Sequence, residues 1–311
     1  MERPTRSLVS TEDLSDADLR AVVARGVDHA AGRVARSLPL TGDVVGIYFR
    51  KTSTRTRTAF SAGALRLGAQ IVTFGPDDLQ TNTGETVGDT GRVLARMLDV
   101  IVARTAGPQR ELADWAGQRR MAVVNAMTAE EHPTQALTDL TTMARHFGRV
   151  EGLRVCYLGE GNNTAAALAS VLPRFGGVAL ELRTPPGYGL TEEVRARAEA
   201  NAARSGASFT ERHDMDELPS GVDVIYTTRW QTTGTSKPRP DWRQVFAPFQ
   251  VTPKMWVDSP TAVFMHDLPA HRGEEVTAEV LDGPASLALD QAENKMHSAM
   301  AVLEWCRHVL P

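Results

Sequence analysis

The chain has 311 residues, and at about 150 residues per domain this length predicts two domains. Its 34 basic and 38 acidic residues leave a formal net charge of -4, so we do not expect the strongly basic surface of a nucleic-acid-binding protein. The sequence lacks the roughly 20 consecutive apolar residues of a membrane span, and no signal-like apolar stretch opens it. Two cysteines cannot form a multi-bridge framework, so we expect a cytoplasmic protein without a nucleic-acid or membrane partner.

Short runs rich in Val and Ile alternate with longer segments of helical period in the first half of the chain. A structural helix is expected first, because apolar residues from Leu19 to Val34 recur three and four positions apart. The alternation that follows is typical of an α/β domain with a parallel sheet. The expected strands are Val44–Phe49, Gln70–Phe74, Val100–Arg104 and Ala122–Asn125, and the expected helices are Arg55–Leu67, Thr86–Leu98, Gln109–Gln118 and His132–Phe147.

A second α/β domain is expected to begin where glycines interrupt the helical pattern, in the segment Phe147–Gly152. We therefore divide the chain into domains 1–149 and 150–290, each a doubly wound parallel sheet, with a C-terminal helix within 291–311 that packs back on the first domain. The polar segment Gln231–Arg243 contains Gly and Pro and predicts a mobile loop. The later elements expected are strands at Arg154–Leu158, Ala179–Leu182, Val222–Tyr226, Ala262–His266 and Ser286–Leu289, and a final helix at Gln291–Leu310.

The segment Ser53–Arg57 combines hydroxyl and guanidinium groups. It follows a strand and opens a helix, so these groups and the free backbone N–H groups meet at the positive end of a helix dipole, where anions bind. Taken alone, the segment fits equally well an N-cap by Ser53 or Thr54 with arginines in solvent.

A second polar segment, His132–Gln135, favours a functional site. Pro133 is placed at the start of a helix, so His132 and Gln135 lie three positions apart on one helical face. For the dipeptide His132-Pro133 by itself, a structural histidine is the default interpretation.

With these motifs the chain resembles the aspartate and ornithine carbamoyltransferase family over nearly its whole length. The matching segments, in the family's order, are Phe49–Arg57, Gly84–Thr90, His132–Leu137, Gly161–Asn163, His266–Ala270 and Asp290–Lys295. The segments Leu268–Ala270, Arg272–Val276 and Gln291–Asn294 resemble the ornithine branch. The resemblance implies transfer of a carbamoyl group from carbamoyl phosphate to an amine, by a homotrimer with sites at its subunit interfaces.

The resemblance also implies roles at the donor site. Carbamoyl phosphate presents a dianionic phosphate, a carbonyl oxygen that gains negative charge, and an NH2 group that needs acceptors. Lys295 replaces an arginine near the phosphate and keeps the charge without the bidentate fork. Neither a metal nor a cofactor is expected. The implied partners are Ser53, Thr54, Arg55 and Thr56 for the phosphate, Arg104 and His132 with Thr56 for the carbonyl, and Gln135 with the backbone carbonyl of Leu268 for the NH2 group.

The turn Gly159–Thr164 begins like a dinucleotide-binding fingerprint, so a nicotinamide-dependent oxidoreductase is the rival enzyme class. Thr164 stands in place of the third glycine, which makes the match partial. In the family that the chain resembles, this turn belongs to the acceptor domain, and Asn163 matches the asparagine that holds the acceptor's α-carboxylate.

The acceptor site departs from the ornithine branch in a motif of the form Asp-x-Trp-x-Ser-Met-Gly, where this chain reads Thr228–Gly234. The aspartate that pairs with ornithine's α-ammonium is therefore missing at Thr228. Since a charge-assisted hydrogen bond contributes roughly 1.5 to 3 kcal/mol, we expect free ornithine to bind poorly. Thr232 and Thr233 of the same frame are expected acceptor contacts.

A second departure is Asp267, which replaces the cysteine of the family's His-Cys-Leu-Pro motif. Its carboxylate is expected to take the proton of the reacting amine or to bind the ammonium form. The alternative is that Asp267 restores, from the other side of the pocket, the carboxylate lost at Thr228. The expected catalytic residues are Arg104, His132, Gln135 and Asp267, and the expected acceptor contacts are Asn163, Thr228, Thr232, Thr233, Asp267 and Leu268.

These observations predict an N-carbamoyltransferase whose acceptor is a diamine or diamino acid with a blocked or absent α-ammonium, and whose product carries a ureido group. The chain resembles in this respect the enzymes that carbamoylate a 2,3-diaminopropionyl residue in peptide antibiotic biosynthesis. An ornithine carbamoyltransferase that makes citrulline is the alternative within the family. A noncatalytic family member that only binds anions is the alternative of another class.

Overall fold

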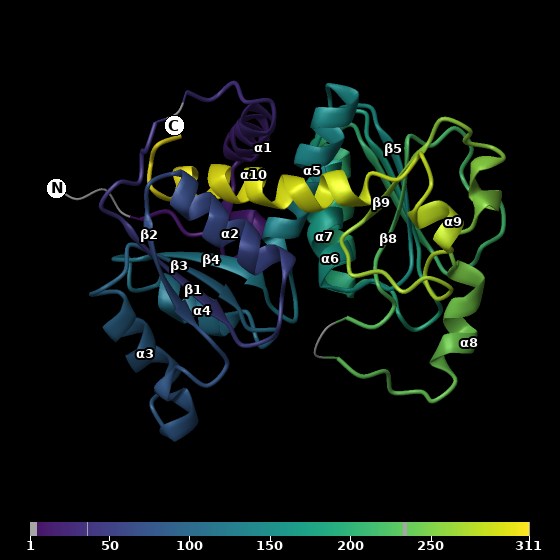
Figure 1. Ribbon diagram of the computed structural model, residues 1–311. Coiled ribbons are helices and arrows are strands. Elements are labelled where there is room, and N and C mark those ends of the chain that lie inside the picture. The colour runs from purple at the N-terminus through teal and green to yellow at the C-terminus, as the bar shows by residue number, and fades with distance from the viewer. Residues whose placement is uncertain (1–4, 36, 233–234, 311) are drawn as a thin grey trace. The chain divides into compact units, whose positions relative to one another are not determined.

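The computed structural model describes residues 5–35, 37–232 and 235–310, and the chain divides into two compact units (Figure 1). Unit 1 is Met1–Arg145 with Glu293–Pro311, and unit 2 is His146–Ala292. The chain passes from one unit to the other inside helix α5 (Pro133–Phe147) and again inside helix α10 (Ala288–Cys306). The predicted boundary at 149/150 lies a few residues after the first passage.

Unit 1 is built on a parallel sheet with the strand order β2-β1-β3-β4 among the described residues. In Figure 1 the long yellow helix α10 runs alongside α2, while α3 and α4 lie on the other side of the sheet. Short 3-10 turns occupy Thr11–Asp13 and Gln80–Thr83. The strands are β1 (Val44–Phe49), β2 (Gln70–Phe74), β3 (Val100–Arg104) and β4 (Ala122–Met127), and the helices, besides α5 and α10, are α1 (Asp16–Ala30), α2 (Arg55–Arg66), α3 (Val87–Leu94) and α4 (Arg110–Ala116).

Glycines lie at two close helix contacts in unit 1. A Cβ atom at Gly91 of α3 would lie 2.4 Å from Cδ1 of Trp115 in α4, so only glycine allows this approach. A Cβ at Gly63 of α2 would lie 3.1 Å from Cγ of Met300 in α10. The C-terminal helix α10 therefore packs directly on α2 at Met300.

Unit 2 is a second parallel sheet, with the strand order β7-β6-β5-β8-β9 among the described residues. Apolar residues of β5, β8 and β9 pack against α9, and α6 and α7 lie on the opposite side (Figure 1). Further 3-10 turns occupy Leu172–Arg174, Ala247–Phe249 and Pro253–Trp256. The strands are β5 (Arg154–Leu158), β6 (Ala179–Arg183), β7 (Ser208–Arg212), β8 (Val224–Thr227) and β9 (Val263–His266), and the helices are α6 (Asn163–Val171), α7 (Glu192–Ser205), α8 (Trp242–Phe246) and α9 (Ala278–Leu281).

Three sequence predictions need correction in unit 2. The predicted strand Ser286–Leu289 is wrong, because only an isolated bridge joins Ser286 to β9, and α10 begins at Ala288 with Leu289 exposed. The edge strand β7 was not predicted, since its sequence, Ser-Phe-Thr-Glu-Arg, has little of the apolar character of a buried strand. The predicted loop Gln231–Arg243 extends too far, because Trp242 and Arg243 belong to α8.

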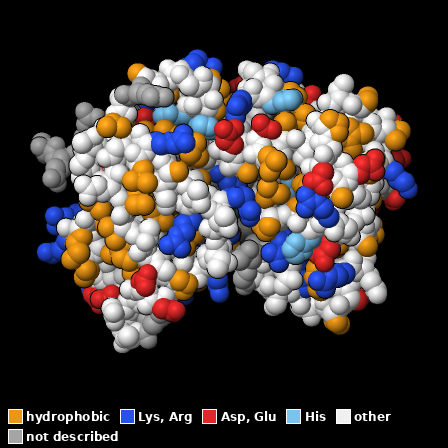
Figure 2. All heavy atoms as spheres, viewed as in Figure 1, with side chains coloured by type: hydrophobic (Ala, Val, Ile, Leu, Met, Phe, Trp, Pro, Cys, Tyr) orange, Lys and Arg blue, Asp and Glu red, His pale blue; other side chains and the backbone are white. Residues whose placement is uncertain are grey.

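The surface carries charges of both signs. On the face of unit 2 seen in Figure 2, acidic and basic side chains are interspersed, in keeping with the small net charge. No helix of the described residues is both long enough and apolar enough to span a membrane.

Candidate active site

The site predicted in unit 1 lies at the point in the sheet where the strand order reverses, between β1 and β3. Because β2 and β3 lie on opposite sides of β1, the carboxyl ends of β1 and β3 form a topological switch point, where α/β sheets bind ligands. Residue Arg104 ends β3 opposite Phe49 of β1. The segment Ser53–Thr56 connects β1 to the start of α2.

The start of α2 is available to an anion. Thr54 occupies the N-cap position with helical dihedral angles, and its side chain makes no capping hydrogen bond with any described residue. The interpretation of this segment as an ordinary side-chain cap by Thr54 is therefore wrong. Arg104 Nη1 donates to Thr56 Oγ1 at 3.5 Å, which ties the end of β3 to the first turn of α2.

The start of α5 contributes His132 and Gln135. His132 is only 4% exposed, and its Nδ1 lies 3.3 Å from the hydroxyl of Thr134. Burial, together with the positive charges of Arg104 and Lys295, holds the pKa of His132 well below its usual range. The imidazole is therefore neutral near pH 7 and carries its proton on only one of its two ring nitrogens.

Lys295 of α10 donates to Gln135 Oε1, and Gln135 Nε2 donates to Asp139 Oδ1 at 2.6 Å. Sequence reasoning missed Asp139, although its position one helical turn after Gln135 was a usable signal. Gln135 and Lys295 line a small recess together with Thr56, Ala59, Phe60, His132, Thr134 and Thr138. The structure thus brings residues from α2, α5 and α10 to one place.

Unit 2 has its own switch point between β5 and β8, at the start of α6. Asn162 caps α6, because its Oδ1 accepts from the N–H groups of Thr164 and Ala165. Its Nδ2 donates to Thr228 Oγ1 at 3.0 Å, and the Tyr157 hydroxyl lies 2.9 Å from the same oxygen. Thr228 is therefore a buried and fully engaged hydroxyl at the position where the resemblance places an aspartate.

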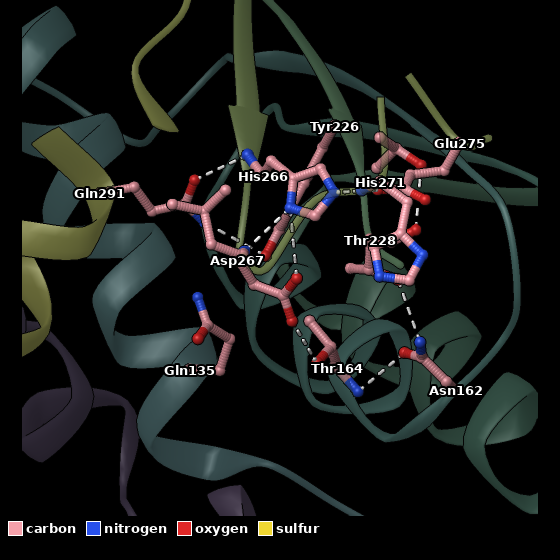
Figure 3. A network of polar contacts seen from close by, with 12 residues as sticks. Gln135, Asn162, Thr164, Tyr226, Thr228, His266, Asp267, His271, Glu275 and Gln291 are labelled. Carbon is pink, nitrogen blue, oxygen red and sulfur yellow. Dashed lines mark hydrogen bonds and ion pairs between the residues drawn. The ribbon is translucent and has the colours of Figure 1, made fainter. Parts of the chain in front are cut away.

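Asp267 follows β9 and contacts the same helix terminus. The Thr164 hydroxyl donates to Asp267 Oδ2 at 3.2 Å (Figure 3). The first turn of α6 thus connects Thr228, through Asn162, with Asp267, through Thr164. Neither Asn162 nor Thr164 was predicted as a site residue, although both lie in the glycine-rich turn that the sequence singled out.

A buried network positions the residue after Asp267. Leu268 has a φ of 53°, a left-handed conformation that costs of order 1–3 kcal/mol outside glycine and needs support from its surroundings. Its N–H donates to His266 Nδ1 at 2.8 Å, and His266 Nε2 lies 3.1 Å from Oε1 of the fully buried Glu275 (Figure 3). Gln291 Oε1 accepts from the His266 N–H. These contacts fix the direction of the Leu268 backbone.

Among the other predicted acceptor contacts, Asn163 is buried as the first residue of α6, and Thr232 is partly buried. Thr233 lies outside the described residues. One cluster of described residues, His271, Glu274 and Glu275, places a ligand atom from each side chain within 4.8 Å of the others. Oε1 of Glu275 already accepts from the N–H of His271 at 2.6 Å, so internal hydrogen bonds hold this cluster.

Both halves of the chain match one enzyme family. The carbamoyl-phosphate-binding domain model of the aspartate/ornithine carbamoyltransferases matches residues 6–145, and the aspartate/ornithine-binding domain model matches residues 151–306. The chain belongs to the aspartate/ornithine carbamoyltransferase family. It is therefore an enzyme, a carbamoyltransferase, and the oxidoreductase and noncatalytic alternatives are wrong. The second model reaches residue 306, whereas unit 2 ends at Ala292.

Related proteins cover the chain almost completely. It is 39% identical over 303 residues to the ornithine carbamoyltransferase of Symbiobacterium thermophilum, covering 96% of each chain. It is 40% identical over 265 residues to that of Thermococcus kodakarensis, covering 85% of this chain and 84% of the relative. The solved structure of the ornithine carbamoyltransferase from Pyrococcus furiosus is similar with a TM-score of 0.90 at 36% identity, covering 97% of this chain and 96% of that chain.

Proposed function

We propose that unit 1 of this carbamoyltransferase binds carbamoyl phosphate through Ser53, Thr54, Arg55 and Thr56 at the start of α2. The observation that carries this proposal is the convergence of Thr56, Arg104, His132 and Gln135 at one switch point, next to a helix terminus without a side-chain cap. A dianionic phosphate there gains from the helix dipole, from free N–H groups and from the Arg55 guanidinium.

The same residues are suited to the transfer step. The neutral tautomer of His132 that carries its proton on Nε2 donates a hydrogen bond to the carbamoyl oxygen, where negative charge develops in the tetrahedral transition state. Arg104 supplies positive charge to the same oxygen, while the Gln135 amide oxygen accepts from the NH2 group. Lys295 stands behind Gln135 and orients its amide. We propose that orientation and charge stabilisation, which together contribute on the order of 10 kcal/mol, drive the reaction without a metal or cofactor.

Two acceptors are supported by different observations. The names of the relatives favour ornithine, with citrulline as the product, and this is the first candidate. The second candidate, a diamine or diamino acid with a blocked or absent α-ammonium, such as a peptidyl 2,3-diaminopropionyl group, is supported by Thr228. This residue offers a neutral hydroxyl that two neighbours already engage. For either acceptor, the proposed role of Asp267 is to take the proton of the reacting amine or to bind its ammonium form.

A steady-state comparison of amines tests both candidates. Phosphate release is measured with saturating carbamoyl phosphate and either L-ornithine, Nα-acetyl-L-ornithine or a 2,3-diaminopropionyl peptide. The second candidate requires kcat/KM for ornithine at least about tenfold below that for the best blocked acceptor, which corresponds to roughly 1.4 kcal/mol. Efficient turnover of ornithine to citrulline would establish the first candidate and exclude the second.

We also propose a homotrimer in the cytoplasm. Unit 1 exposes large hydrophobic side chains, among them Leu38, Leu65, Val93 and Met97, and such surface is commonly covered in oligomers. Light scattering coupled to gel filtration would give the mass of three chains; a mass of one chain would exclude the trimer.

A further inference from the structure

A lysine lies buried in the polar loop between Trp230 and α8. The side chain of Lys237 is only 2% exposed, and its ammonium group forms an ion pair with the carboxylate of Glu160. Glu160 belongs to the turn between β5 and α6, whose next residues include the cap Asn162. The loop Gln231–Arg243, whose composition predicts mobility, is thus held by this ion pair to the turn between β5 and α6.

Aromatic rings form the walls around this ammonium. Lys237 Nζ lies 4.9 Å from the ring centre of Phe246 and 5.1 Å from that of Tyr188, within the range of cation–π attraction. These two rings pack edge to face with their centres 4.8 Å apart, and Trp230 packs on Phe246 at 5.6 Å. Trp230 Nε1 and Tyr188 Oη are buried without a hydrogen-bond partner among the described residues. We name Glu160, Tyr188, Trp230 and Phe246 the ammonium cage.

The two charges in the cage depend on each other. Burial raises the pKa of Glu160, and the neighbouring Lys237 opposes this shift. Burial likewise lowers the pKa of Lys237, and Glu160 opposes it. Removing one member of a buried ion pair leaves the other charge uncompensated. Without Lys237, the Glu160 carboxylate would therefore take up either a proton or another cation of suitable size.

The cage adjoins the position where the family's ammonium-binding aspartate is missing. The hydroxyl of Tyr157 donates to the backbone carbonyl of Glu160 and contacts Thr228 Oγ1. A Cβ at Gly159, the residue before Glu160, would lie 3.9 Å from both Thr228 O and Trp230 Cδ1. One carboxylate near Thr228 is thus already neutralised by an ammonium group of the protein itself.

We propose that the ammonium cage is a binding site for a primary ammonium group, that Lys237 occupies it, and that Lys237 is thereby a specificity-determining residue. With the cage filled, Glu160 cannot pair with a free α-ammonium of the acceptor. This inference rests on the proposed function, in which unit 2 binds an amine whose α-ammonium is either free or blocked.

The test replaces Lys237 with methionine, which has a similar length and no charge. We measure kcat/KM for ornithine, whose α-ammonium is free, and for Nα-acetylornithine, whose α-amine is blocked. The ratio of the first value to the second should be at least tenfold higher in Lys237→Met than in wild type. The gain should disappear in the double variant Lys237→Met with Glu160→Gln. Lys254→Met, at an exposed lysine of the same unit, is the matched control and should leave the ratio unchanged.

A binding measurement makes the test independent of turnover. Propylammonium chloride should raise the Tm of Lys237→Met saturably above an equal concentration of sodium chloride, and should not do so for wild type or the double variant. Circular dichroism checks that each variant is folded, and Lys237→Gln replaces the methionine variant if that one does not fold.

The inference is overturned if propylammonium does not raise the Tm of Lys237→Met saturably. It is also overturned if KM rises equally for ornithine and Nα-acetylornithine in this variant, because Lys237 would then only hold the loop in place. These failures are distinct from failure of the proposed function, in which wild type binds carbamoyl phosphate but transfers its carbamoyl group to no amine.

Discussion

The donor residues of unit 1 and the acceptor residues of unit 2 differ in how their charges are balanced. Burial, together with the neighbouring positive groups of Arg104 and Lys295, depresses the pKa of the His132 imidazole. In unit 2 the carboxylates are already engaged, Asp267 by the Thr164 hydroxyl and Glu160 by Lys237. The proposed donor site is thus rich in positive charge, whereas on the proposed acceptor side one carboxylate is hydrogen-bonded and the other is ion-paired within unit 2.

This difference has a chemical reason. Every carbamoyl phosphate molecule presents the same dianion and the same developing oxyanion, so the positive groups that bind it have little freedom to vary. An acceptor amine can instead carry different groups at its far end, and exchanging a single carboxylate for a hydroxyl changes which of them is tolerated. We therefore expect substitutions in unit 1 to abolish activity and substitutions in unit 2 to redirect it.

The largest effect is expected for Arg55→Ala. Losing two charge-assisted hydrogen bonds of about 1.5 kcal/mol each should weaken carbamoyl phosphate binding at least about 100-fold. Isothermal titration calorimetry measures this directly. Arg57→Ala, which removes an exposed arginine one residue beyond Thr56, is the control and should bind normally. Unchanged affinity in Arg55→Ala would remove α2 from the donor site.

The acceptor site should respond to Thr228→Asp combined with Asp267→Cys. The double variant restores the carboxylate that the ornithine branch uses for the α-ammonium, so kcat/KM for ornithine should rise about tenfold. The first turn of α6 contacts both positions, so the combined effect on log kcat/KM should exceed the sum of the two single effects. The control Ser236→Asp adds a carboxylate in the polar loop Gln231–Arg243 and should not raise kcat/KM for ornithine. Strictly additive effects would show that the two positions act separately.

A smaller effect is expected for Gln135→Ala. Its proposed partner is the carbamoyl NH2 group, so kcat should fall about fivefold to tenfold, as expected for loss of one hydrogen bond of about 1 to 1.4 kcal/mol. The affinity for inorganic phosphate, which lacks that group, should change much less. Gln70→Ala, at an exposed glutamine of β2, should alter neither. If Gln135→Ala weakened the binding of inorganic phosphate as much as it lowered kcat with carbamoyl phosphate, the role assigned to Gln135 would be contradicted.

The last expected effect concerns stability rather than activity, and it is the pH dependence that the buried His132 gives to the free energy of unfolding. Its pKa is depressed in the folded state, so below about pH 6.5 the unfolded chain binds a proton that the folded chain excludes. The free energy of unfolding should therefore decrease as the pH falls below 6.5, by up to about 1.4 kcal/mol per pH unit from this group. Denaturant titrations should show a shallower dependence in His132→Asn and an unchanged one in His146→Asn, whose histidine is exposed. If the free energy of unfolding changed equally with pH in wild type and in His132→Asn, the lowered pKa of His132 would be refuted.

Much of this architecture was predictable from sequence. The strands β1, β2, β3 and β5 were predicted to the residue. For β1, β3 and β5 the signal is an apolar run, which marks a buried parallel strand, whereas β2 is a partly exposed edge strand. The donor motifs were visible because each lies within a few residues at a strand end or helix start. Short motifs are enough to predict such a site, because a parallel sheet places the carboxyl ends of its strands, and the helix starts that follow them, at one edge.

The tertiary structure decided what depends on partners distant in sequence. The contact between Glu160 and Lys237 spans 77 residues, and that between Thr164 and Asp267 spans 103. No local pattern shows that a lysine in a polar loop is buried, that Ser286 forms only a bridge, or that the polar segment Ser208–Arg212 pairs as an edge strand. The sequence by itself determined the fold class, the family and the donor motifs, because these reside in periodicity and short motifs. The partners of the acceptor-side charges were decided only by folding, because burial and long-range pairing set the state of a charge.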